Sequence, residues 1–380
     1  MGTGGAAPVV MPHAVSFESR MLRNEYYAEG CAWADFNKDG HQDLLLGPLW
    51  YVGPDLLVSH EVEEAKVYGY SDRTRRHFMS FAHDFDGDGW MDVMSVGYIG
   101  TDARWYRNPG DPTKLLEHWE QHTLFQGVGG EAPLFAELVA GGGPELVFEA
   151  GGKLGYAVPA ADVTQPWQFQ AIGQQGFTHG LGVGDIDGDG LNDVVLKSGW
   201  YKQGTGTPPT WQSMPADFSL GHDGGGHMRI FDVDGDQDAD VVTSMDAHAY
   251  GLYWFEQVRQ GDVISFTPHE ILPTQNSDGN FSQLHALDVA DFNGDGLLDL
   301  VTGKRWWAHE ERDPGALDPA VVYWFELQRT PGQLPSFKPH LVHSDSGIGL
   351  QVCASDLNGD GRPDIAAANK KGLSLHLQKP

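Results

Sequence analysis

The sequence predicts an all-β protein built from repeated units, and three observations support this fold class. The 380 residues include 50 glycines and 22 prolines, almost no long amphipathic helical pattern is present, and one acidic motif recurs along the chain. Glycine and proline favour turns between short strands. A hydrophobic content of 40% suffices for a buried core and excludes a disordered chain.

The charge balance narrows the function classes. Asp and Glu number 53 against 24 Lys and Arg, a formal net charge of −29, which argues against nucleic acid or an anionic membrane surface as a partner. No run of about 18 apolar residues occurs, so we expect no membrane span. The first thirty residues lack a signal-peptide pattern. We expect a flexible N-terminal segment at 1–14 within a single domain spanning 1–380.

The repeated motif has the form D-x-[DN]-x-D-G-x-x-D. Intact or nearly intact copies begin at Asp35, Asp84, Asp185, Asp232, Asp291 and Asp356. A seventh copy at 137–145 keeps acidic residues only at its two ends. Such internal repetition is typical of arrays of one structural unit.

Alternating oxygen ligands around a central glycine describe a calcium loop, with side chains at positions 1, 3, 5 and 9 and a backbone carbonyl at position 7. An EF-hand is excluded because position 12 is never acidic. We expect about six bound calcium ions, none in the seventh copy, and weaker binding where Gln237 replaces the glycine. The predicted ligands are Asp35, Asn37, Asp39, His41, Asp43, Asp84, Asp86, Asp88, Trp90, Asp92, Asp185, Asp187, Asp189, Leu191, Asp193, Asp232, Asp234, Asp236, Asp238, Asp240, Asp291, Asn293, Asp295, Leu297, Asp299, Asp356, Asn358, Asp360, Arg362 and Asp364.

These loops, each followed by an apolar strand, resemble the FG-GAP/VCBS repeat of integrin-α-type β-propellers. The resemblance covers nearly the whole chain and implies a seven-bladed β-propeller whose calcium loops join the first and second strands of six blades. Counting strands gives the same answer, because each unit has room for the four strands of a blade. The last unit stops one strand short, and residues 15–22 match the missing strand, so we expect the N-terminal strand to close the ring.

Cys31 and Cys353 fall on inner strands that meet at this seam. A closing disulfide and two buried thiols are both compatible with that placement. The sequence favours free thiols, because unpaired cysteine is commonly buried.

Blade topology also predicts where function lies. In an antiparallel meander the calcium loops occupy one face, so the heads of the first strands and the second-to-third-strand loops meet on the other face. Functional groups usually lie on such loops. As catalytic candidates we identify His179, His285, Lys304, Arg305, His309 and Tyr98. As substrate-binding candidates we identify His222, His248, Asp246, Trp306, Trp307, Lys197 and Glu131.

Several chemistries fit these residues. Neutral imidazoles of His179, His227 and His285 could hold a second metal, such as zinc or magnesium, which would polarise an oxygen of the substrate. Without a metal, a histidine base beside Lys304 and Arg305 suits proton abstraction next to a carbonyl. Any single histidine here can also be structural.

Four segments, 177–185, 222–226, 246–252 and 302–309, resemble the propeller portion of the aldos-2-ulose (1,5-anhydrofructose) dehydratase family. This resemblance implies water elimination from a keto-sugar. We therefore expect a carbon–oxygen lyase acting on a sugar in a secreted or periplasmic setting. A non-catalytic propeller that binds a glycan or a protein, and a polysaccharide lyase acting on a uronate, remain alternatives.

Overall fold

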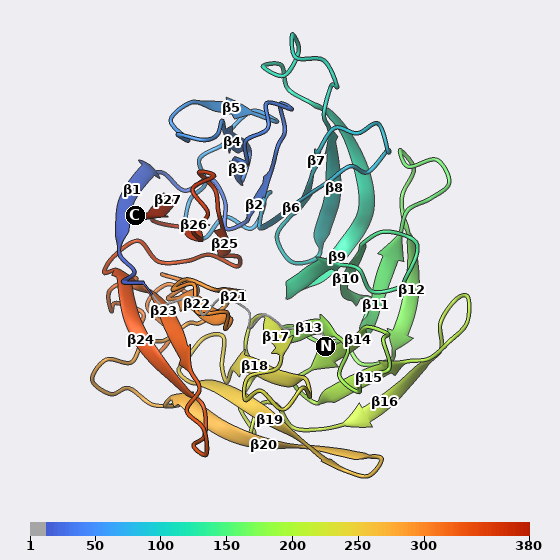
Figure 1. Ribbon diagram of the computed structural model, residues 1–380. Coiled ribbons are helices and arrows are strands. Elements are labelled where there is room, and N and C mark those ends of the chain that lie inside the picture. Colours follow the sequence, from blue (N-terminus) through green and yellow to red (C-terminus); the bar gives the residue numbers. More distant parts are fainter. Residues whose placement is uncertain (1–12) are drawn as a thin grey trace, which may run out of the picture.

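The computed structural model describes residues 13–380, and within this range it contains 27 β-strands and no helix. The predicted all-β class is confirmed. The sheets are arranged around a central axis (Figure 1). Among these residues no helix is long and apolar enough to cross a membrane. Residues 1–12 of the predicted flexible segment lie outside the described residues.

Four sheets are antiparallel meanders of four strands that are consecutive in the chain. The first contains β2 (Cys31–Ala34), β3 (Asp43–Leu46), β4 (Leu49–Tyr51) and β5 (Ser59–Glu61). The second contains β13 (Leu181–Gly184), β14 (Asp193–Leu196), β15 (Gly199–Gln203) and β16 (Trp211–Pro215). The third contains β17 (Met228–Phe231), β18 (Asp240–Ser244), β19 (Leu252–Gln260) and β20 (Val263–Leu272). The fourth contains β21 (Leu287–Ala290), β22 (Asp299–Gly303), β23 (Val322–Gln328) and β24 (Ser336–His343).

A seven-stranded sheet holds the region between the first and second of these meanders. Its strands are β6 (Met79–His83), β7 (Asp92–Val96), β8 (Thr101–Arg107), β9 (Glu120–Ala136), β10 (Glu145–Ala150), β11 (Lys153–Val158) and β12 (Gln168–Gly173). Strand β9 pairs with β8 through residues 120–128 and with β10 through residues 129–136. Hydrogen bonding therefore gives six sheets in residues 13–380, not the seven separate sheets that the sequence predicts, because one long strand serves two units.

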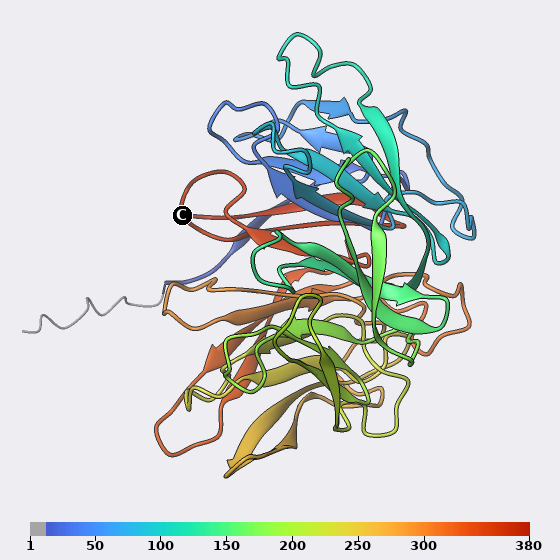
Figure 2. The same ribbon diagram turned by 90° about the vertical axis from the view of Figure 1, so that its right-hand side faces the viewer.

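The remaining sheet joins the first strand to the last three strands. It contains β25 (Cys353–Ser355), β26 (Asp364–Asn369), β27 (Gly372–Gln378) and β1 (Phe17–Arg23). Strand β1 pairs antiparallel with β27, Phe17 opposite Gln378. The N-terminal strand thus supplies the fourth strand, as predicted, and Figures 1 and 2 both place the C-terminus beside it.

Burial follows the position of each strand in its sheet. The second strand of a unit is buried along its whole length, as in β18, except for the last two residues of β10, because neighbouring sheets cover both of its faces. The outer strand β20 mostly alternates between exposed and half-buried positions. Inner strands approach one another closely near the axis: a Cβ atom on Gly226 would lie 1.5 Å from the carbonyl oxygen of His285. Only glycine fits there.

Cys31 on β2 and Cys353 on β25 form a disulfide, with their Cα atoms 6.3 Å apart. The expectation of free thiols is wrong. Both residues are buried on adjoining inner strands, and the sequence alone does not reveal which way the two side chains point. The bond joins the first meander to the sheet that contains β1 and β27.

Reduction of this disulfide is expected to lower the free energy of unfolding by about 2–4 kcal/mol, because the bond constrains an unfolded loop spanning 322 residues. Guanidinium denaturation with and without reductant measures the loss. The C31A/C353A variant should show a similar loss and no response to reductant. Equal stability of the oxidised and reduced protein would contradict this role.

Candidate metal centre

The acidic loops are folded by their own carboxylates. In the loop that follows β13, Asp185 accepts hydrogen bonds from the amides of Gly188 at 2.8 Å and Gly190 at 2.9 Å. This wrapping brings oxygens of Asp185, Asp187 and Asp193 within 4.8 Å of one another. Equivalent triads occur at Asp84, Asp86 and Asp92 and at Asp232, Asp234 and Asp240. In the other three complete loops an asparagine supplies the middle oxygen, at Asn37, Asn293 and Asn358.

The donor set of these loops fits a hard cation such as calcium, which prefers several oxygens. Oδ1 of Asp187 is buried without a hydrogen-bond partner, a costly arrangement that a cation would relieve. Basic side chains already lie beside three loops: Lys202 contacts Asp187 and Asp189, Arg107 contacts Asp86, and Arg259 contacts Asp238. The crowded carboxylates thus attract positive charge from their own protein.

The ninth-position carboxylate has a second, structural role that the sequence analysis missed. Asp193 accepts the amide of Ile186 at 3.0 Å and that of Gln203 at 2.8 Å, so it ties its loop to β15. The same pair of contacts is made by Asp43, Asp92, Asp240, Asp299 and Asp364. Glu145 makes the loop contacts, with Leu138 and Val139, in the eroded copy. The eroded copy keeps an acid at the ninth position although it lacks the inner carboxylates. This feature of the sequence could have indicated the structural role.

A second cluster lies at the heads of the inner strands. Ligand atoms of Glu131, His179, His248 and His285 all lie within 4.8 Å of one another. Nε2 of His179 is 3.2 Å from Nε2 of His248 and 3.8 Å from Oε2 of Glu131, and Nε2 of His285 is 3.4 Å from the same oxygen. These spacings suit tetrahedral coordination, in which ligand atoms about 2.0–2.1 Å from zinc lie about 3.3 Å apart.

Two of the three imidazoles, those of His285 and His248, are held in the neutral form that binds a metal. Burial lowers the pKa of His285 well below its usual value, and Arg305 lowers it further. Burial also lowers the pKa of His248. Nδ1 of His285 is buried without a partner. Three nitrogens and one carboxylate in a largely buried position form a donor set that fits zinc.

Arg305 joins the cluster to the opposite side of the axis. Its Nη1 is 2.6 Å from Oε2 of Glu131 and 2.9 Å from Nε2 of His285, and its Nε is 2.5 Å from Oε2 of Glu29. Burial would raise the pKa of Glu29, but Arg305 and then Arg75 lower it to about 2. Arg305 likewise overcomes burial and holds the pKa of Glu131 well below its usual range. The guanidinium of Arg305 is therefore paired with two carboxylates.

Outer contacts orient the side chains of the cluster. Nδ1 of His248 lies 3.3 Å from Oδ2 of Asp313, which also accepts the side-chain amide of Gln283 at 2.9 Å. A carboxylate behind a metal-binding histidine fixes the ring and raises its basicity. The exposed His309 stacks on His248 with centroids 4.0 Å apart and contacts Oδ1 of Asp313 at 3.1 Å. Asp313 was missed by sequence reasoning, although it lies four residues after His309.

Several predicted residues lie outside the cluster. The second-metal prediction included His227, but His248 occupies the third imidazole position and His227 faces a separate cavity. Nζ of Lys304 is buried against Ser282 at 2.9 Å and Gly315 at 2.5 Å, so it does not face the cluster as its predicted role requires. Tyr98 packs on Phe78 and Arg75.

The predicted substrate-binding residues are dispersed. Nζ of Lys197 is bonded to the carbonyl of Asp223, His222 is exposed, and Asp246 accepts the amide of His248. Trp306 packs on Tyr70 and Trp307. Of the predicted candidates, Glu131, His179, His248, His285, Arg305 and His309 are the ones that meet.

Comparison with known families supports the repeat assignment. An FG-GAP-like repeat matches residues 232–302, and an FG-GAP repeat matches residues 349–372. The chain therefore carries FG-GAP repeats, as the acidic loops predicted. No curated protein sequence matches the chain. Among solved structures, an exotype rhamnogalacturonan lyase, YesX, aligns over 97% of this chain and 75% of its own, with 11% sequence identity and a TM-score of 0.45.

Proposed function

We propose that this protein is a metal-dependent carbon–oxygen lyase that eliminates water from a sugar or keto-sugar. The observation that carries the proposal is the convergence of Glu131, His179, His248 and His285 within 4.8 Å at the strand heads. A zinc ion held there would act as a Lewis acid towards a carbonyl oxygen of the substrate. The resemblance of four segments to keto-sugar dehydratases gives the substrate class.

The chain's own groups supply the proton transfers of an elimination. A base removes a proton next to the carbonyl, the carbon–carbon double bond forms, and the departing hydroxyl takes up a proton to leave as water. His309 is exposed, stacks on a cluster histidine and is oriented by Asp313, so it can move a proton between substrate and solvent. Arg305 is already paired with two carboxylates, and the protein carries a charge of −29. Both features favour a neutral keto-sugar over a polymeric uronate.

The fold proposed for this activity is a closed ring of seven blades in one domain. Strand β9 would serve as the outer strand of the second blade and the inner strand of the third, which resolves the seven-stranded sheet into two blades sharing one strand. About six calcium ions would occupy the acidic loops. The disulfide supports the proposal of a secreted or periplasmic location, since disulfides persist in oxidising compartments.

The H179A/H285A variant tests the catalytic proposal. With 1,5-anhydrofructose as the probe, wild-type protein should form an unsaturated product that absorbs in the ultraviolet. The variant should lose its bound transition metal and more than about 100-fold in turnover, while its circular dichroism stays unchanged. His118, which is exposed and paired with Glu61, supplies the control: H118A should keep full turnover. Turnover that persists in the double variant would refute the catalytic assignment, and saturable binding without product would favour the binding-protein alternative.

A further inference from the structure

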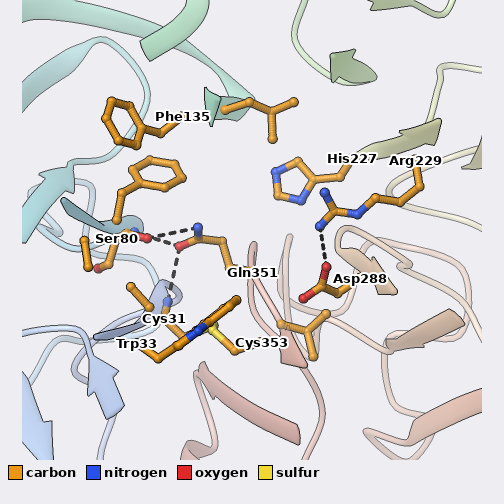
Figure 3. A pocket seen from close by; sticks show the side chains of 14 residues that line it. Cys31, Trp33, Ser80, Phe135, His227, Arg229, Asp288, Gln351 and Cys353 are labelled. Carbon is orange, nitrogen blue, oxygen red and sulfur yellow. Dashed lines mark hydrogen bonds and ion pairs between the residues drawn. A yellow bond between two sulfur atoms is a disulfide. The ribbon is translucent and has the colours of Figure 1, made fainter. Parts of the chain in front are cut away.

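A cavity lies farther along the axis than the metal cluster. Its volume is about 320 Å³, and it is lined by residues of the inner strands β2, β6, β9, β17, β21 and β25 (Figure 3). None of Glu131, His179, His248 and His285 lines it. On β9 the lining residue Phe135 follows Glu131 by four positions, about 13 Å along an extended strand. The cavity is thus displaced from the cluster towards the acidic loops.

Two buried side-chain atoms of the lining residues lack a partner, Nε2 of His227 and Oγ of Ser80. His227 is 4% exposed, its Nε2 is buried and makes no hydrogen bond, and its ring points into the cavity. Burial lowers the pKa of His227 to about 3, so the ring is neutral. A buried nitrogen without a partner is costly, and a bound hydroxyl would satisfy it as donor or acceptor.

The polar side chains of Arg229, Asp288 and Gln351 bond to other groups of the protein. Arg229 forms an ion pair with Asp288 at 3.0 Å, which leaves no net charge. The side-chain oxygen of Gln351 accepts the amides of Cys31 and Ser80, and its nitrogen donates to the carbonyl of Ser80. Gln351 is therefore structural, and His227, Ser80 and Arg229 are the groups able to contact a ligand.

Aromatic side chains supply the apolar walls. Phe81 and Phe135 pack together with centroids 5.8 Å apart, and both line the cavity. Trp33 also lines it and remains 38% exposed. Aromatic faces beside a few hydrogen-bonding groups are the usual composition of a small-molecule site. The volume lies at the lower end of the range for such sites, which corresponds to a single sugar ring.

We infer that this cavity binds a neutral, hydroxyl-bearing ring of monosaccharide size. Nε2 of His227 and the guanidinium of Arg229 contact its hydroxyl groups, and the aromatic side chains pack against its C–H face. A net charge of −29 and the paired Arg229 disfavour an anionic ligand. This site is separate from the proposed lyase centre and does not depend on it.

Calorimetric titration with glucose, galactose, mannose, xylose and rhamnose tests the inference, with galacturonate as the anionic comparator. At least one neutral sugar should bind saturably, and galacturonate should bind at least tenfold more weakly. W33A and H227Q should each weaken the binding by about five- to tenfold. Trp33 is partly exposed, so W33A should fold even if the buried H227Q does not.

Two controls separate this site from the metal cluster. H179A/H285A should bind the sugar with unchanged affinity, whatever its turnover. H376Q alters another buried histidine, one that already bonds Ser19 at 2.7 Å outside the cavity, and should leave the affinity unchanged. Absence of saturable binding by every neutral sugar, or equal affinity in wild type, W33A and H227Q, would overturn the inference.

Discussion

Removal of divalent cations with a calcium chelator is expected to unfold the protein at room temperature or lower its melting temperature by tens of degrees. The formal charge of −29 would fall to about −17 with six bound dications, so their loss restores severe repulsion among clustered carboxylates. A site kept at about 1,000 times its Kd contributes about 4 kcal/mol. Several such sites together exceed the roughly 5–15 kcal/mol stability of an ordinary domain. Calorimetric scans with and without chelator measure the effect.

Matched loop variants identify the source of this dependence. D187N removes one charge from a complete loop and leaves an amide where Oδ1 is now buried without a partner. It should raise the calcium concentration needed for full stability. E137Q removes one charge from the eroded loop, which lacks inner carboxylates, and should not change that concentration. A melting temperature that does not change when the chelator is added would contradict the calcium assignment. If monovalent salt fully restored the melting temperature, the effect of calcium would be charge screening and not specific binding.

The repeat made the acidic loops predictable from sequence, because the spacing of their carboxylates is local. The double role of Asp193 could not be predicted from the sequence, since its contact with Gln203 depends on how the next hairpin folds back. The disulfide between Cys31 and Cys353 could not be decided for a related reason. Spacing places both residues on adjoining strands, but side-chain direction decides whether two sulfurs meet.

Strand geometry explains which candidate residues were misplaced. Neighbouring residues in an extended segment point to opposite sides, so Lys304 and Arg305 could not both face the axis. Arg305 reaches the cluster, whereas Lys304 is enclosed by Ser282 and Gly315. His248 approaches the cluster from a loop, and strand periodicity says nothing about how far a loop folds over the axis.

Replacement of Arg305 by methionine is expected to cost about 3–5 kcal/mol of stability, because it leaves buried carboxylates without their shared cation. Arg305 is 3% exposed and bonds both Glu29 and Glu131. R305K restores a charge but not the two-sided geometry of a guanidinium, so it should recover only part of the loss. Urea denaturation of the three proteins gives the free energies, and an R305M protein as stable as wild type would contradict the account.

Double variants should show which carboxylate depends more on Arg305. Glu29 keeps the hydroxyl of Tyr26 at 2.6 Å and Arg75 at 4.0 Å, whereas Glu131 keeps only the imidazoles of the cluster. Relative to R305M, the free energy of unfolding should therefore rise more in E131Q/R305M than in E29Q/R305M. Equal recovery would mean that the two carboxylates share Arg305 evenly.

The R305M variant also links the stability of the protein to the proposed metal. Without Arg305, the cation best placed to compensate Glu131 is one bound by that carboxylate and the three histidines. Added zinc should therefore stabilise R305M more than it stabilises the wild type, since binding to the native state alone raises stability. The gain should vanish in R305M/H179A/H285A, which keeps Glu131 but lacks two imidazoles. A gain that survives removal of those histidines would place the zinc elsewhere, for instance in the acidic loops, and would separate Arg305 from the metal centre.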